Sequence, residues 1–222
     1  MQHRNLTWIM LGVALLLAGC GSAEPRSQRP AGSRPVTLNI PTSRATQACF
    51  ADLSRQAVRY SPMPDRDFGG GCLVVGAVQL IDIGLPVTNL KAMRCGLADA
   101  FVGWARHAVA PAAHQMLGSD LVRIETYGTY ACRNVIGNPN ASARLSGHAI
   151  ANAVDVAGFV LEDGRRITIQ HDWQSDDPGV HDFLRTIHES ACKRFGTVLS
   201  PDYNAAHANH LHLEDDHAHF CR

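Results

Sequence analysis

The sequence has no excess charge of either sign, because 20 Lys and Arg residues balance 20 Asp and Glu residues. It also lacks a basic run interleaved with aromatic residues, and it shows no internal repeat. A nucleic-acid partner is therefore not indicated, since such partners require a basic patch for the phosphate backbone. No two cysteines have the CxxC spacing, so a site built from cysteines alone is not indicated either.

The N-terminus lacks an apolar run long enough to span a bilayer. Its apolar segment, residues 6–17, has about a dozen residues, whereas a membrane-spanning helix needs roughly 20. Arg4 precedes it, as the positive residue does in a secretory signal peptide. The tetrapeptide LAGC that ends at Cys20 resembles the lipobox of bacterial lipoproteins, in which the cysteine is acylated. We expect residues 1–20 to be a lipoprotein signal peptide with Cys20 as the lipidation site; an ordinary signal peptide is the alternative.

The residue after Cys20 is glycine rather than aspartate, which by resemblance to enterobacterial sorting indicates a lipid anchor in the outer membrane, facing the periplasm. Six further cysteines form an even set, which in an oxidising compartment predicts three disulfides of open connectivity. They are Cys49, Cys72, Cys95, Cys132, Cys192 and Cys221. Residues 21–47, rich in Ser, Arg, Pro and Gly, predict a flexible tether. Residues 48–222 are long enough for one domain, which we expect to be a monomer.

Hydrophobic patterns predict a mixed α+β domain. Period-two or apolar runs indicate short strands at 72–83 (interrupted at Gly76), 121–130, 153–160, 165–170 and 209–214. Apolar residues at helical spacing indicate helices at 90–117 and 179–195, and Pro111 marks a break or a second helix start within the first. We therefore expect a small antiparallel sheet flanked by helices and stapled by disulfides.

Two histidine-containing stretches stand out in the last third of the chain. His148 precedes Asp155 by seven residues, and Asp155 lies in an otherwise apolar strand-like run, where a carboxylate is costly to bury unless it is paired or bound to a metal. His210 and His212 are two residues apart in a predicted strand and so point to the same face. A turn or cap residue is the alternative for Asp155, and a backbone-bonded loop histidine is the alternative for His148.

These stretches together resemble a known pattern. The segments ARLSGHAIANAVDVAGF, DGRRITIQHDW, RIETYGTYACRN and FLRTIHESACKRFGTVLSPDYNAAHANHLHLE look like the extensin-like C-terminal domain family. The arrangement SxHxxxxxxD followed by HxH is similar to the zinc peptidase superfamily of lysostaphin-type endopeptidases, D-Ala-D-Ala carboxypeptidases and the hedgehog N-terminal domain. The resemblance implies a hedgehog/DD-peptidase-like fold and a periplasmic zinc peptidase that acts on peptidoglycan or another cell-wall peptide.

The resemblance also implies roles for individual residues. His148, Asp155 and His212 fall on the three zinc ligands, and two imidazoles with one carboxylate leave a fourth position open, which is typical of a catalytic Zn²⁺ site. His207 falls on the general base and His210 on a residue that lines the site. Arg133 falls on the arginine that contacts the substrate carbonyl or carboxylate. His207, His210 and Arg133 are therefore the expected catalytic residues. For Arg133, a surface charge beside a cysteine is the alternative.

Three positions depart from the family pattern. Gly147 stands where related sequences often have Glu or another polar residue, and Ala151 where they often have Gly, a change that matters only if the backbone needs a positive φ. Related members carry Glu or His as the base, and here the base position holds His207. A histidine can serve as a base near neutral pH, but it also fits a module that holds zinc without turnover. Two functions thus follow from the sequence: a peptidoglycan peptidase, or a non-catalytic zinc-containing module that binds or supports the cell wall.

Overall fold

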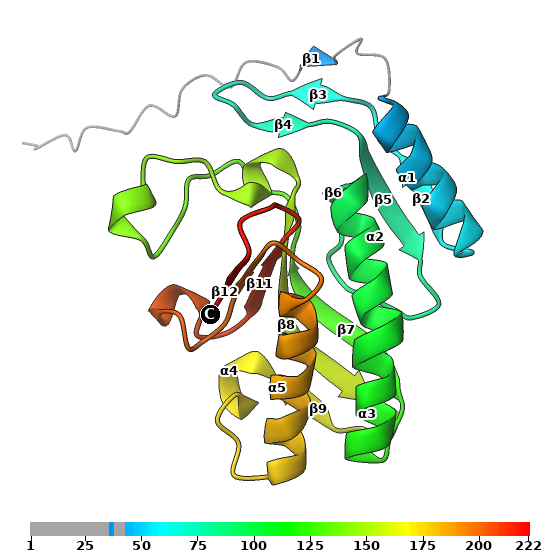
Figure 1. The fold of residues 1–222 in the computed structure, drawn as a ribbon, viewed down its shortest axis with the longest axis vertical. Coiled ribbons are helices and arrows are strands. Elements are labelled where there is room, and N and C mark those ends of the chain that lie inside the picture. Colours follow the sequence, from blue (N-terminus) through cyan, green and yellow to red (C-terminus); the bar gives the residue numbers. More distant parts are fainter. Residues whose placement is uncertain (1–35, 38–42) are drawn as a thin grey trace, which may run out of the picture. The chain divides into compact units, whose positions relative to one another are not determined.

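The computed structural model describes residues 36–37 and 43–222, which form three sheets and a layer of helices (Figure 1). Cys20, the signal peptide and most of the predicted tether lie outside the described residues. Two of the sheets have three strands each. The first consists of β1 (Val36–Thr37), β3 (Arg66–Asp67) and β4 (Leu73–Val74). The second consists of β2 (Arg59–Pro62), β5 (Ala77–Asp82) and β6 (Ala92–Arg94).

The six-stranded sheet carries the C-terminal half of the chain. Its order is β12-β10-β11-β8-β7, with β9 paired to the far end of β8. The strands in chain order are β7 Leu121–Gly128, β8 Ala153–Leu161, β9 Arg166–Thr168, β10 Thr197–Leu199, β11 Leu211–Glu214 and β12 Phe220–Cys221. All pairs are antiparallel except β10 with β12, so the expected antiparallel sheet acquires one parallel edge because β12 returns alongside β10.

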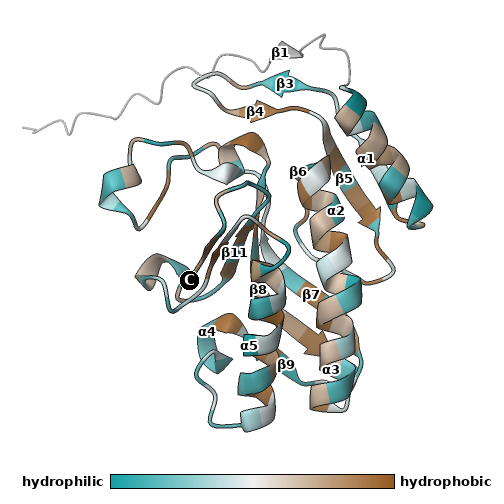
Figure 2. Cartoon of the chain, in the orientation of Figure 1, coloured by the Kyte–Doolittle hydropathy of each residue, from teal (hydrophilic) through white to brown (hydrophobic). Residues whose placement is uncertain are grey.

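Helices cover one face of this sheet (Figure 1). They are α2 Cys95–Trp104, a π-helical turn η1 at Ala105–Val109, α3 Ala110–Leu117 and α5 Pro178–Cys192, while α1 Arg44–Arg55 packs on α2 and α4 Ile169–Asp172 follows β9. Val154 and Val156 of β8 and Leu211 and Leu213 of β11 belong to the same buried cluster as the apolar helix faces. The strands accordingly stand out as apolar in Figure 2, with polar residues on the outer helix faces. Because strand side chains alternate, Asp155 and His212 point to the opposite face.

Most of the predicted elements are present, with differences at helix ends and bulges. The break at Gly76 separates β4 from β5 and has φ +59°, and the β8–β9 hairpin turns at Gly164 with φ +89°. Within the expected strand at 121–130, a register shift turns Val122 outward. Residues 92–94 form strand β6 instead of the first helical turn, since they pair with β5. Pro111 lies in the first turn of α3, which confirms the second helix start expected there, and the chain stays helical before it because the π-helical turn η1 joins α2 to α3.

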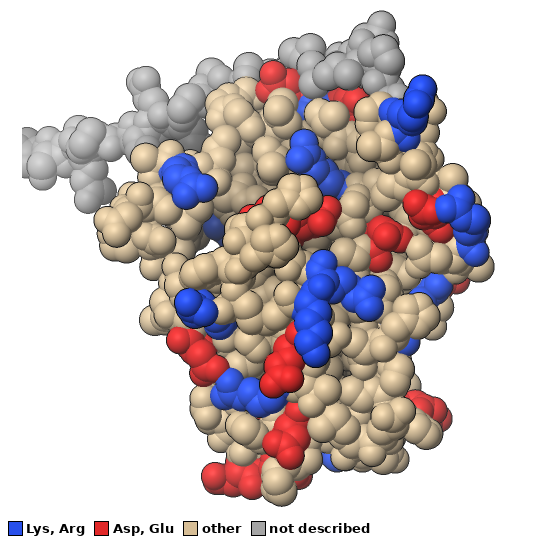
Figure 3. Space-filling view, in the orientation of Figure 1, with Lys and Arg blue, Asp and Glu red and all other residues tan. Residues whose placement is uncertain are grey.

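The folded region begins before the expected domain start. Residues 44–47, assigned above to the tether, form the first turn of α1 because the Ser43 hydroxyl accepts a hydrogen bond from the Thr46 backbone N–H and caps the helix. Three disulfides join Cys49 to Cys95, Cys72 to Cys132 and Cys192 to Cys221, which confirms the expected number and supplies the pairing. Helices in the described part of the chain are too short or too polar to cross a membrane. Acidic and basic side chains are intermixed on the face in Figure 3.

We predict that Trp104 is a principal core contact. Its side chain is fully buried, its indole N–H donates to the Ile187 carbonyl of α5 at 3.0 Å, and its ring meets Phe159 and Phe195 edge-on. Trp104→Ala should lower the free energy of unfolding in urea by about 3–5 kcal/mol. Val122→Ala, at the exposed bulge, should change it by less than about 0.5 kcal/mol. If the two substitutions changed the free energy of unfolding equally, Trp104 would not be a principal core contact.

Candidate metal centre

Strand register brings Asp155 and His212 together. The two residues are direct Cα partners in the antiparallel pairing of β8 with β11. Facing residues of such a pair have Cβ atoms about 4.5–5.5 Å apart, so both side chains share one patch of the sheet. Both are buried, and they lie on the face away from the helices.

His148 reaches the same patch from the loop before β8. It lies in a short 3₁₀ helix, η3 Gly147–Ile150, whose first turn is capped by the Ser146 hydroxyl. Ala151 then adopts a left-handed conformation with φ +55°, which turns the chain into β8. The backbone at residue 151 therefore does need a positive φ, and alanine has a steric cost in this conformation that glycine would not have.

Three ligand-type atoms converge from these residues. His148 Nε2 lies 3.1 Å from Asp155 Oδ1 and 3.2 Å from His212 Nδ1. His212 Nδ1 lies 2.8 Å from Asp155 Oδ1. The structure thus brings together the three residues that sequence resemblance selects as zinc ligands.

The outer nitrogen of each imidazole fixes which nitrogen faces inward. His148 Nδ1 lies 3.1 Å from the Thr129 carbonyl, and His212 Nε2 lies 2.8 Å from Glu214 Oε1. Because a carbonyl or a carboxylate only accepts, these outer nitrogens carry the protons. In the neutral rings, the inner nitrogens present lone pairs to one another and to Asp155. Such an arrangement repels itself unless a proton or a cation lies within it.

Without a metal ion, a proton takes this position. Burial lowers the pKa of His212, but its hydrogen bonds with Asp155 and Glu214 outweigh burial and raise the pKa to about 9. Burial likewise raises the pKa of Asp155, but hydrogen bonds from His148 and His212 hold it well below its usual range. The site therefore concentrates negative potential on its inner atoms, which is the condition for binding a cation.

The donor set fits zinc. In a tetrahedral site with bonds of about 2.0–2.1 Å, neighbouring ligand atoms lie about 3.3 Å apart, close to the separations seen here. Metal-binding histidines usually donate their other N–H to a carbonyl or a carboxylate, as His148 does to Thr129 and His212 to Glu214. Three residues would hold Zn²⁺ and leave a fourth position free.

A cavity of about 530 Å³ adjoins the ligands, and the remaining predicted residues line it. They include Arg133, His207, His210 and His212. His207 follows Asn204, which caps the 3₁₀ helix η4 Ala205–His207. The Asn204 amide nitrogen donates to the Gly137 carbonyl, so its oxygen accepts from His207 Nδ1 at 2.7 Å. His207 Nε2 is therefore the nitrogen left with a lone pair.

The protonation of His207 follows from its surroundings. Burial and the neighbouring His212 and His210 lower its pKa to about 4, so the ring is neutral at pH 7. His210 lies just before β11, and its Nε2 is 3.5 Å from Asp155 Oδ1. Strand parity predicts that His210 and His212 face one site, and both do face Asp155. The Arg133 guanidinium donates to the adjacent Asn134 carbonyl, and among the described residues it has no carboxylate partner.

Sequence reasoning missed the residues that hold the histidines. Glu214 could have been found, because it continues the period-two face of His210 and His212. Asn204 could also have been found, because asparagine is a common N-cap residue and it lies three residues before His207. The Thr129 contact uses a backbone carbonyl, and no side-chain pattern announces it. The structure also explains the glycine at position 147. A Cβ there would lie 2.5 Å from the Glu214 carboxylate, so glycine leaves room for the group that supports His212.

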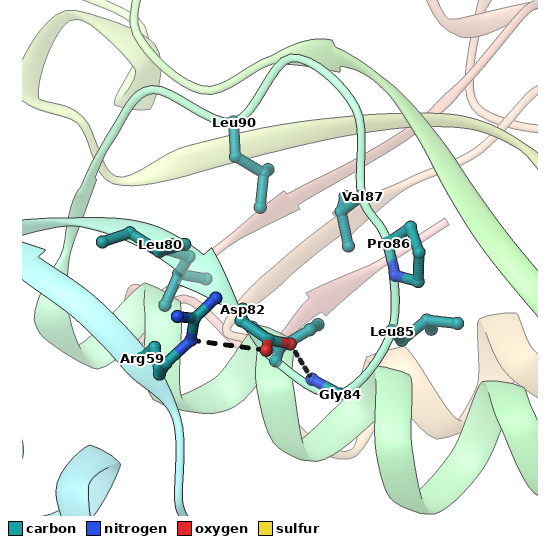
Figure 4. Close-up of a pocket in the computed structure, with 10 residues that line it drawn as sticks. Arg59, Leu80, Asp82, Gly84, Leu85, Pro86, Val87 and Leu90 are labelled. Carbon is teal, nitrogen blue, oxygen red and sulfur yellow. Dashed lines mark hydrogen bonds and ion pairs between the residues drawn. The ribbon is translucent and has the colours of Figure 1, made fainter.

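A second cavity, of about 570 Å³, lies between β2, β5 and the loop after β5 (Figure 4). Its walls are mostly apolar, with Leu80, Val87 and Leu90 among them. Its one carboxylate, Asp82, is engaged by Arg59 Nε at 3.4 Å and by the Gly84 backbone N–H. The described residues that line it include neither a free nucleophile nor a group of metal ligands, so the histidine cavity is the candidate site.

Opposite pH dependences should distinguish the metal-free from the zinc-loaded protein. The folded pKa of His212, about 9, lies above its ordinary 6.5. Its proton therefore stabilises the metal-free fold fully below pH 6.5, by up to about 3 kcal/mol, and this contribution is lost as pH rises through 9. Zinc requires deprotonated ligands, so the loaded protein should instead lose zinc and stability below about pH 6. Melting curves with chelator or zinc test this; parallel profiles would contradict it.

We further predict that Gly147→Ala weakens metal binding while the fold survives. The added methyl group meets the flexible end of Glu214, which can move aside and leave His212 Nε2 without its acceptor. Loss of such an outer partner typically costs 10–100-fold in metal affinity. Zinc titration against a chelating dye measures the change. Gly164→Ala, at a positive φ with open space, is the control for backbone strain and should leave the affinity unchanged.

Comparison with known proteins identifies the family. The model of the family described as Extensin-like protein C-terminus matches residues 47–222. No curated protein and no solved structure matches the chain. The matched range contains all but the first three residues of α1, all six strands of the large sheet and every residue of the site. It also agrees with the extensin-like resemblance seen in the sequence, and the protein belongs to the Extensin-like protein C-terminus family.

Proposed function

We propose that this protein is a zinc-dependent peptidase that hydrolyses peptide bonds in peptidoglycan. The observation that carries the proposal is the convergence of His148 Nε2, Asp155 Oδ1 and His212 Nδ1 beside an open cavity. Resemblance to lysostaphin-type and D-Ala-D-Ala peptidases supports the substrate class. A lipid on Cys20 would hold the protein in the outer membrane on the periplasmic side, within reach of the cell wall.

The chain's own residues supply the remaining steps. Zinc held by the three ligands would polarise a peptide carbonyl and lower the pKa of a water molecule. His207 is neutral at pH 7, so its Nε2 can accept a proton from the attacking water. Because its pKa is low, the protonated ring then readily passes this proton to the leaving amine. Arg133 has no carboxylate partner in the part of the chain that the structure describes, and it is available for the substrate carbonyl or carboxylate. His210 lies at the edge of the ligand set, where it can stabilise the developing oxyanion.

A second candidate function is a zinc-containing module that binds or supports the cell wall without catalysis. The specific observation in its favour is the low pKa of His207, about 4, since a general base works best with a pKa near the operating pH. In this case the ligands would serve the fold, and the cavity would bind wall peptide without cleaving it.

Digestion of purified peptidoglycan tests both functions. The zinc-loaded full chain should release peptide fragments that mass spectrometry detects, and a chelator should abolish the release. His148→Ala should lose both zinc and product. His207→Ala should keep zinc and lose about 10²–10⁴-fold in rate. His217→Ala, an exposed histidine beyond β11, is the matched control and should be as active as the wild type. Wild-type binding to peptidoglycan without any product would favour the second function.

A further inference from the structure

A second cluster of metal-binding side chains lies where α5 meets β12, and it shares no residue with the first. His188 and Cys192 are four residues apart in α5 and so lie on the same helix face. Cys221 in β12 is joined to Cys192 by a disulfide. His188 Nε2 lies 3.7 Å from Cys192 Sγ and 3.8 Å from Cys221 Sγ, so one imidazole faces both sulfur atoms.

This disulfide differs from the other two in exposure. Cys192, Cys221 and His188 are all half-buried. In each remaining disulfide one cysteine is buried: Cys72, whose partner Cys132 is exposed, and Cys95, whose partner Cys49 is half-buried. A reductant and a metal ion can therefore both reach this cluster from solvent.

The imidazole is held in place from its other sides. Trp173 meets the His188 ring edge-on at 5.5 Å, and the Arg222 backbone forms a hydrogen bond with it. Burial lowers the pKa of His188, so the ring is neutral at pH 7 and keeps a lone pair for a ligand. Two contacts besides the sulfurs thus hold the ring in this orientation.

We propose that His188, Cys192 and Cys221 form a redox-gated site that binds Zn²⁺ when the disulfide is reduced. Two thiolates and one imidazole are a ligand set that zinc prefers, with a fourth position for water. While the disulfide is closed, neither sulfur is a thiolate and the set is incomplete.

The chemistry needs a dithiol as reductant. Its two thiols transfer two electrons and two protons, which break the Cys192–Cys221 bond, give two cysteine thiols and leave the reductant as a disulfide. Zn²⁺ then displaces the two thiol protons to solvent and forms two zinc–sulfur bonds and one bond to His188.

The backbone keeps the ligands together after reduction. Cys192 and Cys221 have Cα atoms 5.6 Å apart, and rotation of the side chains separates the sulfurs to the roughly 3.8 Å that two 2.3 Å bonds require. β12 remains tied to β10 because Phe220 N–H donates to the Gly196 carbonyl and Arg222 N–H to the Val198 carbonyl.

Zinc stoichiometry before and after reduction tests the proposal. The purified full chain is treated with a phosphine reductant, equilibrated with zinc, freed of excess ion and analysed for zinc per chain, with circular dichroism as the check on the fold. Reduction should add one equivalent. His188→Ala and the conservative His188→Gln should bind this equivalent at least 10-fold more weakly. His181→Ala, at a half-buried histidine of the same helix that lies outside the cluster, is the matched control and should behave as wild type.

Two further variants separate this site from its surroundings. His148→Ala should lose zinc from the first site and still gain the redox-dependent equivalent, so failure of the proposed function would not affect this result. Cys192→Ser with Cys221→Ser should gain none, although the other four cysteines can still be reduced. Cobalt in the reduced wild type should show sulfur-to-cobalt charge-transfer absorption that His188→Gln alters. An equal gain in the wild type, His188→Gln and the double serine variant, no gain in the wild type, or loss of the fold on reduction would overturn the proposal.

Discussion

Asp155 is a buried carboxylate whose inner oxygen faces three imidazoles, and much of the molecule is arranged around that fact. Such a group is tolerated in a protein interior only when positive charge and hydrogen bonds offset its desolvation. The β8–β11 register supplies His212, and the capped turn before β8 supplies His148. Thr129 and Glu214 then fix the ring nitrogens so that the inner atoms are all lone-pair donors. A cation satisfies this set more completely than one shared proton can.

The large sheet separates packing from chemistry by side-chain parity. Leu211 and Leu213 face the helices and join the core, while His212 and Glu214 face the cavity. The same division holds in β8 for Val154 and Val156 against Asp155. The cavity-facing side chains can therefore vary without disturbing the core, and core residues next to Asp155 and His212 in the chain anchor both of them.

The sequence predicted several of the elements and the three residues that converge in the site. Period-two and helical spacing found β7, β8, β9, β11 and α5, because burial of one face leaves a repeat in the sequence. The π-helical turn before Pro111 and the strand at 92–94 were not predictable, since each depends on tertiary partners instead of local pattern. Likewise, family pattern selected His148, Asp155 and His212, but the Thr129 carbonyl and the space that Gly147 leaves for Glu214 exist only in three dimensions.

Pairing of His212 with Asp155 makes the centre sensitive to misfolding. A shift of β11 by one residue would place a leucine opposite Asp155 and turn His212 into the apolar layer. His148 and Asp155 would stay together in such a molecule, because neither lies in β11, but without His212 the set of three would be incomplete. Metal content would then report on the fold. The fraction of chains that hold an ion would equal the fraction in which β8 and β11 are correctly aligned, although Asp155 and His212 are 57 residues apart in the chain.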